Sequence, residues 1–108
     1  MKHKHYRQGD VLIERISELP PKLKKLKRVG GRLILAEGEV TGHHHAIADE
    51  HCALLAESET AQVTFLEIKE AVAALTHEEH STITLPPGNY RVTRQREYSP
   101  EAIRRVAD

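Results

Sequence analysis

The chain has 108 residues, of which 39% are hydrophobic and 30% are charged, and its formal net charge is zero. This length suits one domain around a single core, and no apolar run approaches the ~20 residues that a membrane span needs. The single cysteine excludes an internal disulfide, and no apolar segment follows the charged N-terminus as it would in a secretory signal, so we expect a cytoplasmic protein.

The first half of the chain predicts strands that are separated by one basic segment. Residues 10–16 form a short apolar run, which indicates a strand that ends before Pro20. Residues 20–31 are rich in lysine and close with two glycines, a pattern typical of a basic surface loop or a one-turn helix. Residues 32–37 predict the next strand, which leads towards the first histidines.

The second half predicts more strands, a hairpin and a helix. Residues 52–56 and 62–68 have strand character, and we assign residues 70–76 to a strand although their alanines also suit a helix. Residues 82–85 alternate polar and apolar. The next four residues, Pro-Pro-Gly-Asn, suit a type II turn, so we expect a hairpin with a strand over residues 90–98.

The last residues predict a helix, because Ser99 is a good N-cap and Pro100 is tolerated at the first helical position. Together these elements predict a mainly β fold. We expect a small single-domain β-barrel or sandwich over residues 1–108, with a basic loop over residues 20–31 and a short C-terminal helix over residues 99–107. Cys52 is expected to be a small core residue.

Two histidine clusters indicate a function. In an extended strand the side chains at i and i+2 share a face, so His43 and His45 should point the same way, with His44 opposite. His77 and His80 have a spacing that suits a turn. Acidic residues surround both clusters, which favours cations and should raise the pKa of an unligated histidine there.

We therefore expect one divalent ion, zinc, iron or nickel, with imidazole ligands from both clusters. The predicted ligands are His43, His45, His77 and His80. An extended second cluster would present Glu79 in place of His80. Four nitrogens would make a structural zinc site, whereas three would leave room for water and would make Glu78 or Glu79 the candidate catalytic base. The alternative is that the histidines lie solvated on exposed loops.

A rival hypothesis is a non-catalytic interaction module that binds nucleic acid or an acidic partner. It would use the basic N-terminal arm, the basic loop and arginines near the C-terminus, namely Lys2, Lys4, Arg7, residues 22–28, Arg91, Arg94 and Arg96. The chain has only four aromatic residues, too few for a stacking platform, and its net charge is zero. Nucleic acid is therefore the less favoured partner. Exposed strand edges also make a homodimer plausible.

Several short motifs occur in a fixed order along the chain. They are Gly42-His43 with His45, Thr76-His77-Glu78-Glu79-His80, Leu85-Pro86-Pro87-Gly88 with Tyr90, and Gln95-Arg96-Glu97-Tyr98. On these motifs the chain resembles a family of small uncharacterised proteins from bacterial and phage genomes. The resemblance covers almost the whole length and implies no established activity. A looser likeness is to cupins, which bind metal with an H-x-H pair and a later histidine near a Pro-x-Gly turn, but here that turn follows the second cluster, so the cupin ligand order is broken.

Overall fold

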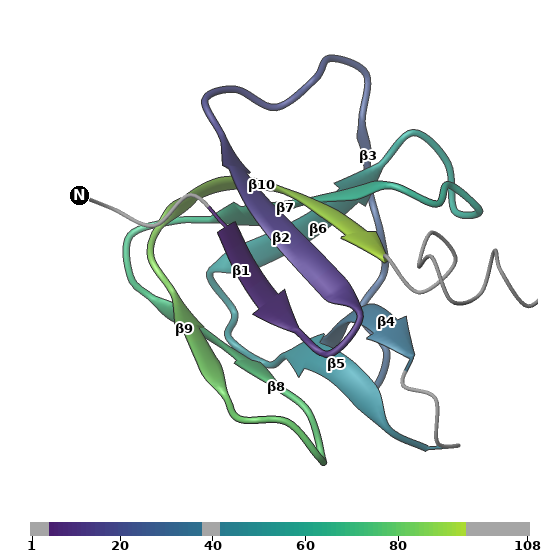
Figure 1. The fold of residues 1–108 in the computed structure, drawn as a ribbon. Coiled ribbons are helices and arrows are strands. Elements are labelled where there is room, and N and C mark those ends of the chain that lie inside the picture. Colours follow the sequence, from purple (N-terminus) through teal and green to yellow (C-terminus); the bar gives the residue numbers. More distant parts are fainter. Residues whose placement is uncertain (1–4, 38–41, 95–108) are drawn as a thin grey trace, which may run out of the picture.

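The computed structural model describes residues 5–37 and 42–94, which form ten β-strands (Figure 1). The strands are β1 (His5–Gln8), β2 (Val11–Ile16), β3 (Lys24–Lys25), β4 (Leu33–Glu37), β5 (His44–Ile47), β6 (Cys52–Ala56), β7 (Thr64–Ile68), β8 (Ala73–Thr76), β9 (Ile83–Leu85) and β10 (Gly88–Arg94). Among the described residues no helix is long and apolar enough to cross a membrane. The predicted helix over residues 99–107 lies outside the described residues.

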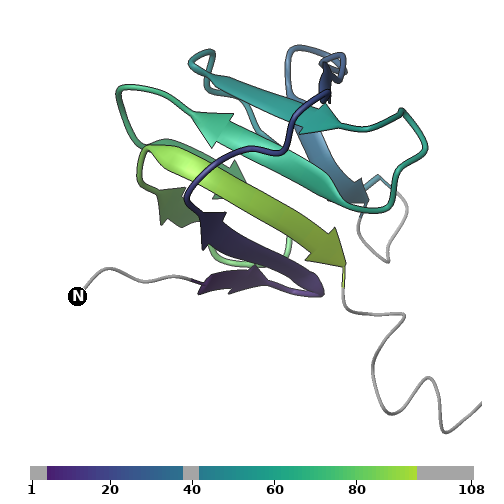
Figure 2. The same cartoon turned by 90° about the horizontal axis from the view of Figure 1, so that it is seen from above.

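The strands form two antiparallel sheets. The larger sheet has the order β1-β2-β10-β7-β6-β3, and the smaller has the order β4-β5-β8-β9. Figure 2 shows the larger sheet crossing the molecule from β1 and β2 through β10 to β7 and β6. All strand pairs in the described part of the chain lie within one sheet or the other, so the sheets do not close. The mainly β prediction is confirmed, whereas the barrel alternative is wrong.

One apolar core lies between the sheets. Alternating residues of most strands point into it, for example Val11 and Ile13 of β2, which are fully buried, and Leu75 of β8 from the opposite sheet. Full burial of such a side chain stabilises the fold by roughly 1.5–3 kcal/mol. Cys52 belongs to this core, as predicted, and its burial raises the pKa of the thiol to about 11. The thiol therefore stays protonated near neutral pH and is a poor nucleophile.

The predicted hairpin around the Pro-Pro-Gly turn is wrong. Leu85 ends β9 in the smaller sheet, whereas Gly88 begins β10 in the larger sheet, so Pro86 and Pro87 carry the chain from one sheet to the other. Proline has no N–H to give to a strand ladder, which suits a connection that leaves a sheet. Arg15 fixes this crossover, since its Nη2 donates a hydrogen bond to the Pro87 carbonyl at 2.8 Å.

The basic segment is mostly irregular, as the predicted loop is, and it includes one short strand. Its β3 pairs with β6 at the edge of the larger sheet, and the Leu26 side chain packs against the core. Arg28 donates hydrogen bonds to the carbonyls of Gly31, Asp49 and Cys52. Four lysines of the segment remain exposed, but this arginine ties the segment to the body of the domain.

Candidate metal centre

The two histidine clusters meet at one end of the molecule, where the two sheets come together. The turn between β1 and β2 belongs to the larger sheet and lies beside β5 of the smaller sheet (Figure 1). This turn has only two residues, Gly9 and Asp10, because Gln8 pairs with Val11. Gly9 has φ +60°, the conformation that a tight hairpin with glycine at its first turn position requires.

Four imidazole rings gather at this end, with the His77 ring in the middle. Its centroid lies 4.2 Å from that of His45, 4.7 Å from that of His80 and 5.8 Å from that of His43. The four histidines of the sequence prediction are therefore neighbours in space. The ion that they were predicted to share stays a prediction.

His45 is the most deeply placed of the four, with 1% of the residue exposed, and Gln8 fixes its ring. The Gln8 side-chain amide donates to the carbonyls of Leu75 at 3.0 Å and Ser81 at 2.9 Å. Its Oε1 atom is therefore the one that faces His45 Nδ1, at 2.9 Å. Nδ1 must carry the ring proton to donate this bond, which leaves Nε2 of the neutral ring with a free lone pair.

The Nε2 atom of His45 faces a carboxylate. It lies 3.6 Å from Oδ1 of Asp10, and the other Asp10 oxygen accepts a hydrogen bond from Arg94 Nη2 at 3.1 Å. Burial lowers the pKa of His45 to about 4, aided by the neighbouring His77, and outweighs the opposite effect of Asp10. The expectation that acidic surroundings raise the pKa is thus wrong for this histidine, which is neutral at pH 7.

The segment between β8 and β9 supplies the remaining groups. The amide of His44 donates to Glu78 Oε1 at 2.9 Å, which lowers the pKa of that carboxyl, and His43 Nδ1 lies 3.4 Å from Glu79 Oε2. His77 Nδ1 accepts a hydrogen bond from the Glu79 amide at 3.0 Å. A pocket of about 190 Å³ lies between these residues and the β1–β2 turn, lined by Asp10, His77, Glu79 and His80.

Three residues of this site were absent from the predicted set of ligands and bases: Gln8, Asp10 and Arg94. A signal for the first two was present in the sequence. Gly-Asp between two runs with strand character is a recognised hairpin turn, and it would have added β1 and brought Gln8 beside Asp10. Arg94 had no comparable signal, because its contact with Asp10 joins residues 84 positions apart.

The cations of the rival hypothesis are partly engaged elsewhere. Arg91 Nη2 forms an ion pair with Glu14 at 2.8 Å, Arg94 pairs with Asp10, and Arg28 binds backbone carbonyls. Lys2, Lys4 and Arg96 lie outside the described residues. In the described part of the chain, four lysines of the basic segment are exposed, and so is Arg7.

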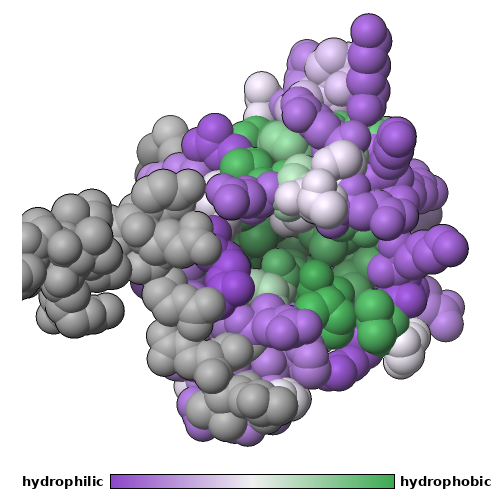
Figure 3. Space-filling view, turned by 90° about the vertical axis from the view of Figure 1, so that its right-hand side faces the viewer, coloured by the Kyte–Doolittle hydropathy of each residue, from purple (hydrophilic) through white to green (hydrophobic). Residues whose placement is uncertain are grey.

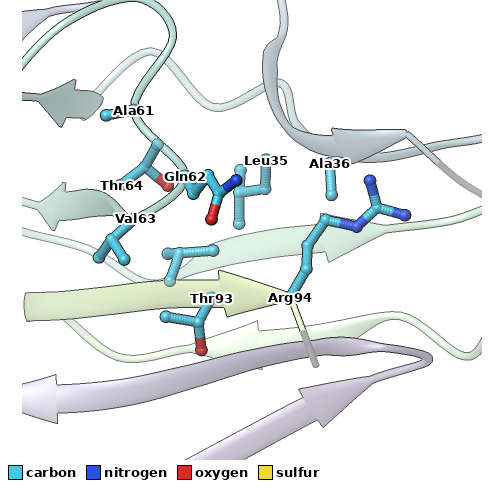
Figure 4. Close-up of a pocket in the computed structure, with 9 residues that line it drawn as sticks. Leu35, Ala36, Ala61, Gln62, Val63, Thr64, Thr93 and Arg94 are labelled. Carbon is cyan, nitrogen blue, oxygen red and sulfur yellow. The ribbon is translucent and has the colours of Figure 1, made fainter. Parts of the chain in front are cut away.

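A separate, more apolar pocket of about 280 Å³ opens between β4 and the ends of β7 and β10. Figure 3 looks onto this side of the molecule, where hydrophobic side chains are visible among hydrophilic ones. In Figure 4, Leu35 and Ala36 lie on one side of the pocket and Thr93 on the other, with Arg94 reaching towards Ala36. Arg94 is the only charged residue in its lining, so this pocket has none of the acid, base or ligand groups of the histidine cluster.

The comparisons with known proteins identify a family without an assigned activity. No curated protein and no solved structure matches the chain. Residues 7–95 match a family described as a domain of unknown function, DUF8820, and this span includes both histidine clusters, Gln8, Asp10 and Arg94. The chain therefore belongs to the DUF8820 family.

Proposed function

We propose that this protein binds a divalent metal ion, zinc, iron or nickel, at the histidine cluster between the two sheets. The observation that carries the proposal is the His45–Asp10 pair, in which a buried imidazole holds a free lone pair towards a carboxylate oxygen 3.6 Å away. Two such acceptors repel each other unless a proton or a cation lies between them. Ligand atoms around a tetrahedral zinc ion lie about 3.3 Å apart, so this pair needs little movement to bind one.

Ligation by the other histidines would complete the coordination and would require their rings to move, because within the described residues only His43, His77 and Glu78 bring ligand atoms within 4.8 Å of one another. His80 lies against the backbone of Gly9, beside His45, and His77 lies between His45 and His43. Ligation by His77 would sacrifice its hydrogen bond with the Glu79 amide, which is worth about 1 kcal/mol. Zinc binding by small structural sites contributes on the order of 10 kcal/mol, so this loss does not prevent it.

The site faces a pocket, which favours an ion that keeps a position for water. A bound divalent ion would supply Lewis acidity there and lower the pKa of a bound water. Glu79 is the better candidate base of the two predicted acids, because it lines the pocket, whereas the Glu78 carboxylate is held by the His44 amide. We assign no substrate.

Elemental analysis of the full chain, purified without a histidine tag, tests the proposal. The protein is stripped with a chelator, loaded with Zn²⁺ and dialysed. We expect stoichiometric zinc in the unmutated protein and in His5→Ala, whose histidine is exposed and pairs with Glu14. The double variant His43→Ala/His45→Ala should lose it. Equal zinc content in the double variant and the unmutated protein would show that the cluster is not the site.

The interaction module remains the second proposal, and it rests on the exposed lysines of the basic segment. Binding of an acidic polymer that weakens steeply with salt, in protein without metal, would favour it. The homodimer and the cytoplasmic location likewise remain predictions.

A further inference from the structure

We infer that the more apolar pocket, which opens between β4 and the ends of β7 and β10, binds a small organic carboxylate with an apolar body. Arg94 is the partner of the carboxylate group. None of the proposed metal ligands lines this pocket, so the inference goes beyond the proposed function and does not depend on a bound ion.

The pocket floor is apolar and belongs to the core. It consists of Leu35 and Ala36 from β4 of the smaller sheet and Val92 from β10 of the larger sheet, each at most 8% exposed. Because β4 and β10 lie in different sheets, no strand ladder closes the space between them. Ala61 and Val63, in the segment before β7, line the pocket on another side (Figure 4). Such walls suit the apolar part of a small ligand.

Arg94 brings a cation to this apolar space. Its side chain is 33% exposed and extends along the pocket towards Ala36 (Figure 4). The Nη2 atom donates to Asp10 at 3.1 Å, but a guanidinium has five N–H donors, so this ion pair leaves donors for a second anion. Within the described part of the chain, Arg94 Nε is buried without a hydrogen-bond partner. Buried polar atoms are normally satisfied, and a carboxylate oxygen in the pocket would supply the acceptor.

The lining selects the chemical class of the ligand. Among the residues that line the pocket, Arg94 carries the only charge, and the polar groups of Gln62, Thr64 and Thr93 are neutral. A single negative charge therefore matches this site, and the planar guanidinium suits a carboxylate. A phosphate monoester carries a charge of about −1.5 to −2 at pH 7 and would call for further cations. The volume of about 280 Å³ lies just below the roughly 300 Å³ at which ordinary ligand pockets begin, so the ligand is a short-chain or single-ring acid.

The experiment is an NMR titration of the full chain, stripped of metal with a chelator so that a carboxylate cannot bind an ion instead. The probe is benzoate, and benzamide, which has the same shape without the charge, is its control at the same ionic strength. Arg94→Gln removes the cation, whereas Arg91→Gln removes an arginine of β10 that pairs with Glu14 and does not line this pocket. Ala61→Phe keeps the cation and puts a larger side chain into the lining. Circular dichroism confirms the fold of each variant.

We expect benzoate to shift the methyl resonances of the pocket floor in a saturable way, in the unmutated protein and in Arg91→Gln. Its affinity should fall by about 10-fold or more in Arg94→Gln, because charge-assisted hydrogen bonds are lost, and benzamide should bind the unmutated protein weakly for the same reason. Ala61→Phe should weaken benzoate binding because it fills space, and it tests the location even if Arg94→Gln fails to fold. Equal affinities for the two probes, or for benzoate in the unmutated protein and a folded Arg94→Gln, would overturn the carboxylate assignment. If neither probe causes saturable shifts, or if Ala61→Phe binds benzoate normally, the pocket is not the binding site.

Discussion

Gln8 is a buried polar residue on which the geometry of His45 depends. Replacing it with leucine, which has a similar size, leaves the carbonyls of Leu75 and Ser81 and the N–H of His45 without partners. Unsatisfied buried groups are destabilising, so we expect Gln8→Leu to lower the free energy of unfolding by about 2–4 kcal/mol. Urea denaturation measures it, with the exposed Gln62→Leu as control. Equal midpoints for the two variants would contradict the role given to Gln8.

Gly9 allows a test of whether His80 belongs to the site, because Gly30 has almost the same φ and can serve as the control. Gly9 and Gly30 have φ values of +60° and +61°, but a Cβ on Gly30 would meet nothing within 4 Å. Both alanine variants should lose about 1 kcal/mol of stability from the left-handed backbone. Only Gly9→Ala displaces His80, so it alone should weaken zinc binding, by about 10- to 100-fold. Calorimetric titration compares them, and equal zinc affinities would exclude His80 from the site.

The spacing of the histidines was sufficient to predict which rings are neighbours, because each pair is close in the sequence and only the two pairs had to meet. Their supporting residues could not be predicted in the same way. Asp10 and Arg94 meet through pairing of β2 with β10, and the sequence alone did not show that these strands are neighbours.

The basic segment tests whether the hydrogen bonds of Arg28 hold β3 at the edge of the larger sheet. Serine at Lys22, Lys24, Lys25 and Lys27 should leave stability nearly unchanged, because these side chains are exposed. Adding Arg28→Ser removes hydrogen bonds to three carbonyls and should cost about 1–3 kcal/mol. Thermal unfolding compares the variant with four serines and the variant with five. Equal melting temperatures would show that the Arg28 hydrogen bonds do not stabilise β3.

The sequence predicted which segments form strands better than it predicted which strands pair with each other. Strands β4, β6 and β7 lie within predicted segments, since β-branched and leucine-rich runs indicate strands locally. Strand β8 also lies within a predicted segment, although its alanines suit a helix as well. The Pro-Pro-Gly segment was misread because turn residues specify a change of direction, and the same residues serve a hairpin or a crossover between sheets. Arg15 holds this crossover through a hydrogen bond to a carbonyl 72 positions away, so its role depends on the tertiary structure.

At the scale of the whole molecule, His45 links stability to pH. Its pKa is about 4 in the folded protein and 6.5 in the unfolded chain, so the unfolded state binds more protons between these values. The metal-free protein should therefore be fully stabilised above pH 6.5 and lose roughly 3 kcal/mol as the pH falls to 4. Urea denaturation across this range measures the loss.

The matched variant for this measurement is His45→Gln, which cannot titrate and should show a smaller loss between pH 6.5 and 4. The same loss in both proteins would show that other groups dominate. Zinc-loaded protein should lose its extra stability over the same range or above it, because protons compete with the ion for each ring.

The candidate site joins three stretches of chain, residues 8–10, 43–45 and 77–81, with Arg94, and its contacts span up to 84 positions of sequence. Contacts of such long range form late in folding, since closing long loops is entropically unfavourable. An ion held there would stabilise the native state much more than the transition state of folding. Bound zinc should thus lengthen the lifetime of the native protein by slowing its unfolding, while the rate at which the chain refolds stays nearly the same.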